Sequence, residues 1–87
     1  MRIKEGFVIR EIAGQSVVIA LGDAAKSYNG MIRLNETAKV IWQGLEKGQD
    51  KDAIIESILA EYDVDRELAE NDFDKFVNAL MGANIIE

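Results

Sequence analysis

The spacing of apolar residues changes at positions 34–35, and this change constrains the fold more than any other feature of the sequence. Before it, β-branched and other apolar residues come in short alternating or continuous runs, as in strands. After it, apolar residues recur at every third or fourth position, as on one face of a helix. Because strands come first and helices follow, we expect an α+β fold with the helices packed on one face of a small antiparallel sheet.

Three segments of the first half are predicted to be strands. Residues 7–12 and 16–21 are separated by three residues that include a glycine, which suits a hairpin. The second segment is apolar on both faces and is expected to lie in the centre of the sheet. The third segment is 31–34. An alternative hairpin pairs 25–28 with 31–34 across an Asn-Gly turn at 29–30, and the pattern does not separate the two arrangements.

Three helices are predicted in the second half, each preceded by a residue suited to cap it. Asn35, Asp50 and Asp65 stand before the three periodic runs, where their side chains can accept hydrogen bonds from free backbone N–H groups. Gly82 is expected to end the third helix, and an apolar tail at 85–86 to return to the core. The three apolar stripes are Leu34, Ala38, Ile41, Trp42 and Leu45, then Ile54, Ile55, Ile58, Leu59 and Tyr62, then Ala69, Phe73, Phe76, Val77 and Leu80.

The residue inventory argues against an enzyme. The 87 residues, expected to form one domain over 1–87, include no histidine and no cysteine. Their absence removes the two most versatile catalytic side chains and the usual ligands of zinc, iron–sulfur and haem sites. We therefore expect no catalytic residue, no metal and no cofactor. The sequence shows no secretory signal and no apolar stretch long enough to cross a bilayer, so a cytoplasmic protein without a membrane partner is expected.

The net charge of −6 is unevenly distributed along the chain. Residues 1–48 carry seven Lys and Arg against five Asp and Glu, a net +2, whereas residues 49–87 carry three against eleven, a net −8. Binding to a phosphate backbone depends on Lys and Arg displacing counterions, so the acidic half should repel it. The charge predicts no nucleic-acid partner.

The third predicted strand is a candidate binding edge. It is short, lacks proline and is the last strand in the sequence, so it is expected at the edge of the sheet. Unpaired N–H and C=O groups of such an edge can recruit another chain as an additional strand. Alternatively, the C-terminal tail or residues 1–5 cover this edge. The residues alone leave both possibilities open.

Over nearly its whole length, the sequence resembles the PqqD family. The most specific part is the run from Gly30 to Ala38, Gly-Met-Ile-Arg-Leu-Asn-Glu-Thr-Ala, followed by Ile41-Trp42. Members that serve pyrroloquinoline quinone synthesis usually have Tyr-Pro-Glu-Gly before the third strand and Gly-Trp near the end. This chain has Ser-Tyr-Asn-Gly at 27–30 and Ala-Asn-Ile-Ile at 83–86, which sets it apart from those members. Further matching positions are Arg10-Glu11-Ile12, Gly48, Ile54, Leu59, Tyr62, Phe73, Leu80 and Ile85-Ile86.

The resemblance implies a winged-helix-like peptide-recognition element of three strands and three helices. Such an adaptor binds the leader region of a ribosomally made precursor peptide and presents it to a modifying enzyme, for example a radical-SAM maturase. In related domains the leader adds a strand to the third strand and lies in a groove walled by the third helix. By position, the resemblance implies peptide contacts at Met31, Ile32, Arg33 and Leu34, and a wall made of Phe73, Phe76, Val77, Leu80 and Met81. A proline at position 32 would then delete a ladder N–H and abolish binding.

Two other functions fit the size of the chain less well. A DNA-binding winged helix would insert its recognition helix into the major groove, but the third predicted helix carries more acidic than basic residues. An acyl-carrier-like protein would need an Asp-Ser-Leu prosthetic site at a helix start, and the serines at 16, 27 and 57 lie elsewhere.

Overall fold

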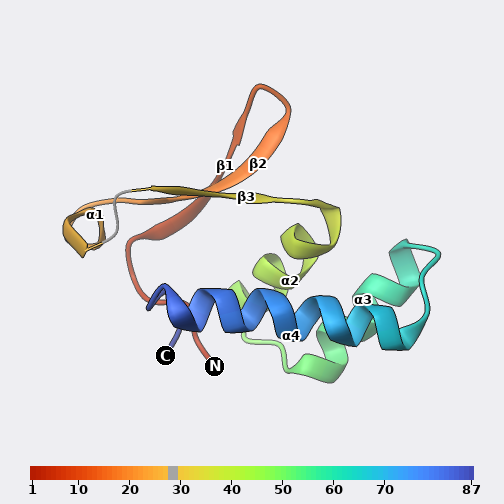
Figure 1. Cartoon of the computed structure of the whole chain (residues 1–87). Coiled ribbons are helices and arrows are strands. Elements are labelled where there is room, and N and C mark those ends of the chain that lie inside the picture. The colour runs from red at the N-terminus through yellow and green to blue at the C-terminus, as the bar shows by residue number, and fades with distance from the viewer. Residues whose placement is uncertain (28–29) are drawn as a thin grey trace.

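Three antiparallel strands form a sheet in the order β1-β2-β3, with β1 Phe7–Ile12, β2 Gln15–Ala20 and β3 Met31–Leu34. This computed structural model describes residues 1–27 and 30–87. Helices α2 (Glu36–Glu46), α3 (Lys51–Glu61) and α4 (Arg66–Gly82) all lie on one side of the sheet (Figure 1). The α+β class, the central position of the second strand and the edge position of the third are confirmed.

The loop between β1 and β2 is shorter than predicted. It contains two residues, Ala13 and Gly14, whose φ angles of 52° and 80° are both positive. Two positive φ angles are typical of the type I′ turn, whose twist matches that of the strands it joins. Ile12 therefore pairs directly with Gln15, and β2 starts one residue earlier than the sequence predicted.

Between β2 and β3, the alternative hairpin of residues 25–28 with 31–34 is wrong. Residues Ala24–Ser27 form α1, a single helical turn, and Lys26 forms an ion pair with Asp23 at 3.3 Å. Four residues give no periodic signal, so the apolar pattern could not indicate this turn. Positions 28 and 29, which include the first residue of the predicted Asn-Gly turn, lie outside the described residues.

All three predicted helix caps are confirmed. The side chains of Asn35, Asp50 and Asp65 accept hydrogen bonds from backbone N–H groups three residues further on, at 2.8, 2.9 and 2.8 Å. Each helix turns its predicted apolar stripe to the core, as expected for an amphipathic helix. The buried stripe residues are Leu34, Ile41, Trp42, Leu45, Ile54, Ile55, Ile58, Ala69, Phe73, Val77 and Leu80.

The end of α4 sends the chain back to the core. Gly82 is the last residue of α4, as predicted, but the residue with positive φ is Asn84, at 61°. Asparagine tolerates this left-handed region better than most residues other than glycine. The N–H of Ile85 donates to the C=O of Leu80 at 2.9 Å, which is the hydrogen bond of a Schellman motif. The predicted return of the tail is confirmed, since Ile85 and Ile86 are buried.

Gly44 allows α2 and α3 to approach closely, a role that no pattern in the sequence indicated. A Cβ atom at this position would lie 2.5 Å from Cγ1 of Ile54, which is fully buried and cannot move aside. We expect Gly44→Ala to lower the free energy of unfolding by about 1–3 kcal/mol, the usual cost of overpacking a core. Gly82→Ala is the matched control, because a Cβ atom there meets nothing within 4 Å. Thermal unfolding would measure both variants, and equal stability of the two would contradict this account.

Candidate functional site

The hydrogen-bond phase of the sheet decides which backbone groups point to the free edges. The N–H of Leu21 donates to the C=O of Gly6 at 2.7 Å, so these residues form a hydrogen-bonded pair. In an antiparallel ladder such pairs alternate with pairs that are not hydrogen-bonded. Val8, Arg10 and Ile12 therefore bond to β2, whereas the backbone groups of Ile9 point away from the sheet.

The same alternation fixes the free edge of β3. Because Val17 uses its backbone groups to bond β1, the neighbouring Val18 turns its own toward β3. Its partner there is Ile32, so the N–H and C=O of Ile32 are used within the sheet. Met31 and Arg33 are out of phase with Ile32, and their N–H and C=O groups point outward. These two residues offer the backbone groups that an added strand would bond.

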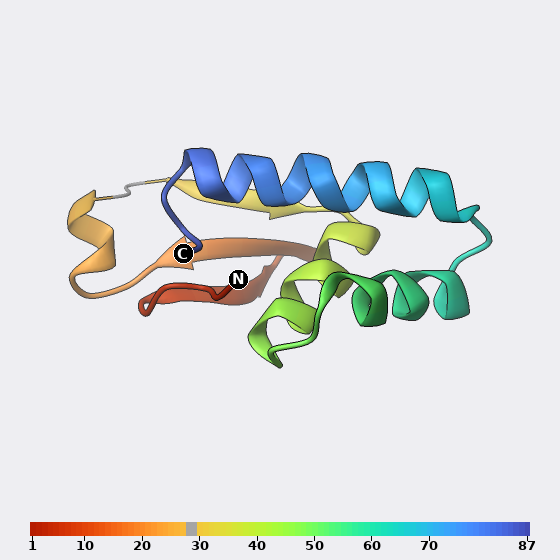
Figure 2. The ribbon, with the colours of Figure 1, turned by 90° about the horizontal axis from the view of Figure 1, so that it is seen from below.

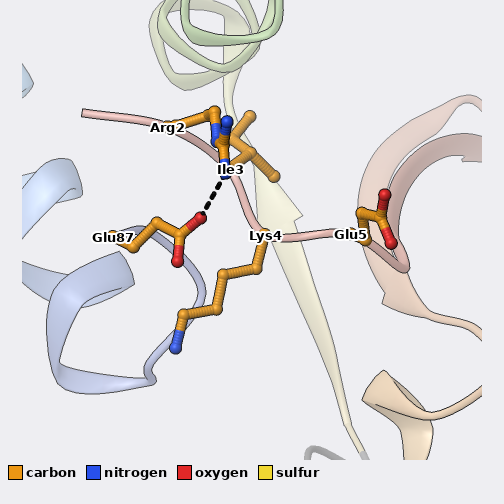
Figure 3. Close-up of a pocket in the computed structure, with 5 residues that line it drawn as sticks. All are labelled: Arg2, Ile3, Lys4, Glu5 and Glu87. Atoms are coloured by element: carbon orange, nitrogen blue, oxygen red, sulfur yellow. Dashed lines mark hydrogen bonds and ion pairs between the residues drawn. The ribbon is translucent and has the colours of Figure 1, made fainter.

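The C-terminal tail and the first residues do not cover this edge. They pair with each other, since Ile3 and Ile86 form an antiparallel bridge and Lys4 N–H donates to Ile85 C=O at 2.8 Å. Figure 3 shows the side chains of Arg2 and Glu87 joined beside this bridge, at 2.9 Å. Within residues 1–27 and 30–87, β3 pairs with β2 alone. The alternative that these segments cover the edge is wrong.

At the opposite edge of the sheet, on β1, a side chain already occupies one of the outward backbone groups. The guanidinium of Arg10 donates from Nη1 to the outward C=O of Ile9 at 3.0 Å. Glu11 accepts hydrogen bonds from the Ser16 hydroxyl at 2.6 Å and from the Lys39 ammonium at 3.0 Å. These two bonds lower the pKa of Glu11 below its ordinary value and tie the end of β1 to α2. The β3 edge is therefore the better candidate for strand addition.

The side chains of β3 alternate between two surfaces. Ile32 and Leu34 face the helices and pack in or against the core. Met31, which is 57% exposed, and Arg33 point to the outer face, where Figure 1 shows no helix above the sheet. Arg33 forms no hydrogen bond or ion pair with any residue that the structure describes. A guest strand beside β3 would extend both surfaces.

The five predicted wall residues of α4 differ in exposure. Phe73, Val77 and Leu80 are buried in the core, and Leu80 has no exposed surface at all. They hold α4 in place and are closed to a guest in this arrangement. Phe76 is partly buried at the margin of the core, and Met81 is 59% exposed.

The two accessible wall residues, Phe76 and Met81, lie on different flanks of α4. Asp74 forms an ion pair at 3.1 Å with Lys51, the first residue of α3, and so marks the flank toward α3. At 3.6 residues per turn, Met81 stands about 20° from Asp74 around the helix, whereas Phe76 stands about 140° from Met81. In Figure 1 β3 runs above α4 and the start of α3 lies below it. The structure thus places Phe76 on the flank toward β3 and Met81 away from it.

Leu68, Asp72 and Ala79 share the flank of Phe76, although none of them was among the predicted wall residues. They follow a spacing of three or four residues along α4, so they form one strip beside the inner stripe. Leu68 is 48% exposed and Asp72 is partly buried. Figure 2 shows α4 running alongside β3, with the C-terminal end of α4 at the start of β3. The spacing of these residues is visible in the sequence, but a search restricted to apolar residues does not select Asp72.

Three further features bear on the kind of site. Among residues 1–27 and 30–87, no three His, Cys, Asp or Glu side chains gather closely enough to hold a metal ion. A cavity of about 520 Å³ lies at the paired termini and is lined by Arg2, Ile3, Lys4, Glu5 and Glu87 (Figure 3). No helix within the described part of the chain has the length and apolar character needed to cross a membrane.

Comparison with known proteins gives a family and two solved structures. The family model described as coenzyme PQQ synthesis protein D (PqqD) matches residues 8–86. The structure of TbiB1 in complex with the TbiA(beta) leader peptide is 30% identical, covers 100% of this chain and 95% of TbiB1, and has a TM-score of 0.78. Lasso peptide synthetase B1 complexed with the leader peptide is 24% identical and shares the fold over 98% of this chain and 93% of its own, with a TM-score of 0.74. No curated protein matches the sequence.

Proposed function

This chain belongs to the PqqD family, and from that premise we propose that it binds the leader region of a ribosomally made precursor peptide and presents it to a modifying enzyme. The observation that carries the proposal is the open β3 edge, in a chain 30% identical over its whole length to a protein solved with a leader peptide. Strand addition to an open edge is an established way of recognising an extended peptide.

The proposed site uses both surfaces of β3. The leader adds as a strand that bonds the outward N–H and C=O groups of Met31 and Arg33. Alternate leader side chains then lie toward the helices, against Ile32, Leu34 and the strip of α4 that contains Phe76. The buried residues Phe73, Val77 and Leu80 support this strip, and Met81 lies outside the proposed contact.

The chain itself is proposed to act without catalysis. With no histidine and no cysteine it has few groups able to move protons or form covalent intermediates near neutral pH. The chemistry would come from the modifying enzyme, for example a radical-SAM maturase. The role of this chain is then to hold one region of the precursor while another region reacts, which raises the effective concentration of the reacting region at the enzyme.

A binding comparison tests this function. We expect the chain to bind the leader peptide of the precursor encoded nearest to its gene with micromolar or better affinity. We expect no binding to a duplex DNA at physiological salt, because the acidic half repels phosphate. Fluorescence anisotropy with labelled peptide and labelled DNA would measure both. Salt-sensitive DNA binding as strong as peptide binding would favour a winged-helix DNA-binding function instead.

A further inference from the structure

Asp72 is a partly buried carboxylate on the flank of α4 that faces β3. It forms no hydrogen bond or ion pair with another residue of the described chain. Of the other acidic residues of this region, Asp74 pairs with Lys51, Glu70 pairs with Arg66, and Asp65 caps the helix. Glu67 also has no partner among the described residues, but it is exposed. Asp72 is therefore the partly buried acidic residue of α4 that has no ion-pair partner among the described residues.

The position of Asp72 on the helix directs it to the proposed site. It lies one turn before Phe76, about 40° away around the axis, and about 160° from Asp74 on the flank toward α3. The same turn of α4 therefore carries one aspartate toward β3 and one toward α3. Only Asp74, the aspartate directed toward α3, has an ion-pair partner within the described residues.

A carboxylate without a partner in the chain can form a charge-assisted hydrogen bond with a cation placed beside it. We propose that Asp72 binds a lysine or arginine of the guest peptide, and so sets the charge that the peptide must carry on its helix-facing side. This inference rests on the proposed function, because it assumes a guest strand along β3. The acidic half of the chain, at −8, favours a basic residue at this position as well.

The proposal predicts a pattern in the guest peptide. Arg33 lies on the outer face of β3 and Asp72 on the helix side, so they contact guest residues on opposite faces of the added strand. Because faces alternate with every residue, the two guest positions are separated by an odd number of positions. The expected guest therefore has an acidic and a basic residue one or three positions apart, with apolar residues on the helix-facing side near Phe76.

A random twelve-residue peptide display library, selected against the whole chain, tests this pattern with peptides of every composition. An enriched peptide is then synthesised and titrated calorimetrically against wild type, Asp72→Asn and Asp74→Asn. Asp74→Asn is the matched control, because it removes the same charge from the opposite flank and breaks only an exposed ion pair. We expect Asp72→Asn to weaken binding roughly five- to thirtyfold, as for loss of a charge-assisted hydrogen bond. We expect Asp74→Asn to change it less than twofold.

The outcomes separate this inference from the function on which it rests. If no peptide is enriched, the proposed function fails and this inference fails with it. If peptides are enriched without a recurring basic residue, or if the two variants weaken binding equally, peptide recognition stands and the role of Asp72 is overturned. In a charge-reversal test, Asp72→Lys should bind a peptide with Glu in place of its basic residue better than the original peptide. Failure of that rescue would also overturn the role of Asp72.

Discussion

Met31→Pro is expected to remove most of the affinity for the leader peptide while the fold remains intact. The N–H of Met31 points to the free edge of β3, so proline deletes a donor that the sheet does not use and that the proposed guest strand would bond. A lost backbone hydrogen bond, together with an unpaired guest carbonyl, costs about 2–4 kcal/mol in total. This corresponds to a loss of roughly 30- to 1,000-fold in affinity, measured by isothermal titration.

Two companion variants make the result of Met31→Pro interpretable. Met31→Ala removes the same side chain but keeps the N–H, and should bind within a few-fold of wild type. Ile32→Pro, which the sequence alone suggested as the test, deletes an N–H that bonds Val18 within the sheet, so it should unfold or destabilise the protein. Circular dichroism would separate these effects. A folded Met31→Pro variant with wild-type affinity would place the peptide site elsewhere.

The sequence predicted which segments form strands and helices better than it predicted which backbone groups of neighbouring strands bond each other. Caps at Asn35, Asp50 and Asp65 and the apolar stripes are local signals, and the structure confirms them. The outward backbone groups of β3 depend on a loop of two residues rather than three, which changes the pairing register by one position. Composition of the loop did not distinguish the two lengths. The choice between Ile32 and Met31 as the exposed donor therefore required the structure.

For a related reason, the sequence could not show which flank of α4 faces β3. Helical periodicity places Phe76 at one margin of the inner stripe and Met81 beyond the other, but it does not show which margin faces β3. Which margin faces β3 depends on where α3 lies against α4, and the pairing of Lys51 with Asp74 marks the flank toward α3. Contacts between elements far apart in sequence carry this information. No local motif shows which flank of α4 faces β3. Asp72 was not among the predicted wall residues because it is not apolar.

Arg33→Gln is expected to weaken leader binding roughly five- to 100-fold, because a partly shielded pair with a guest carboxylate contributes on the order of 1–3 kcal/mol. Arg33 stands in the outermost strand, on the face where an added strand places every second side chain. It has no acidic partner among the residues that the structure describes, so its charge is available to a guest. Isothermal titration with the leader peptide measures the effect.

Arg10→Gln is the matched control for Arg33→Gln. Arg10 and Arg33 are the two cross-strand neighbours of Val17, which is only 3% exposed although no helix covers its face. Both long side chains can shield this valine with their stems, so both substitutions should remove similar packing. Arg10→Gln also removes the hydrogen bond from Arg10 to the C=O of Ile9. Only Arg33 lies at the edge that is proposed to receive the guest. If both variants bind the leader within twofold of wild type, Arg33 is a solvated charge whose effect is limited to discouraging edge-to-edge aggregation.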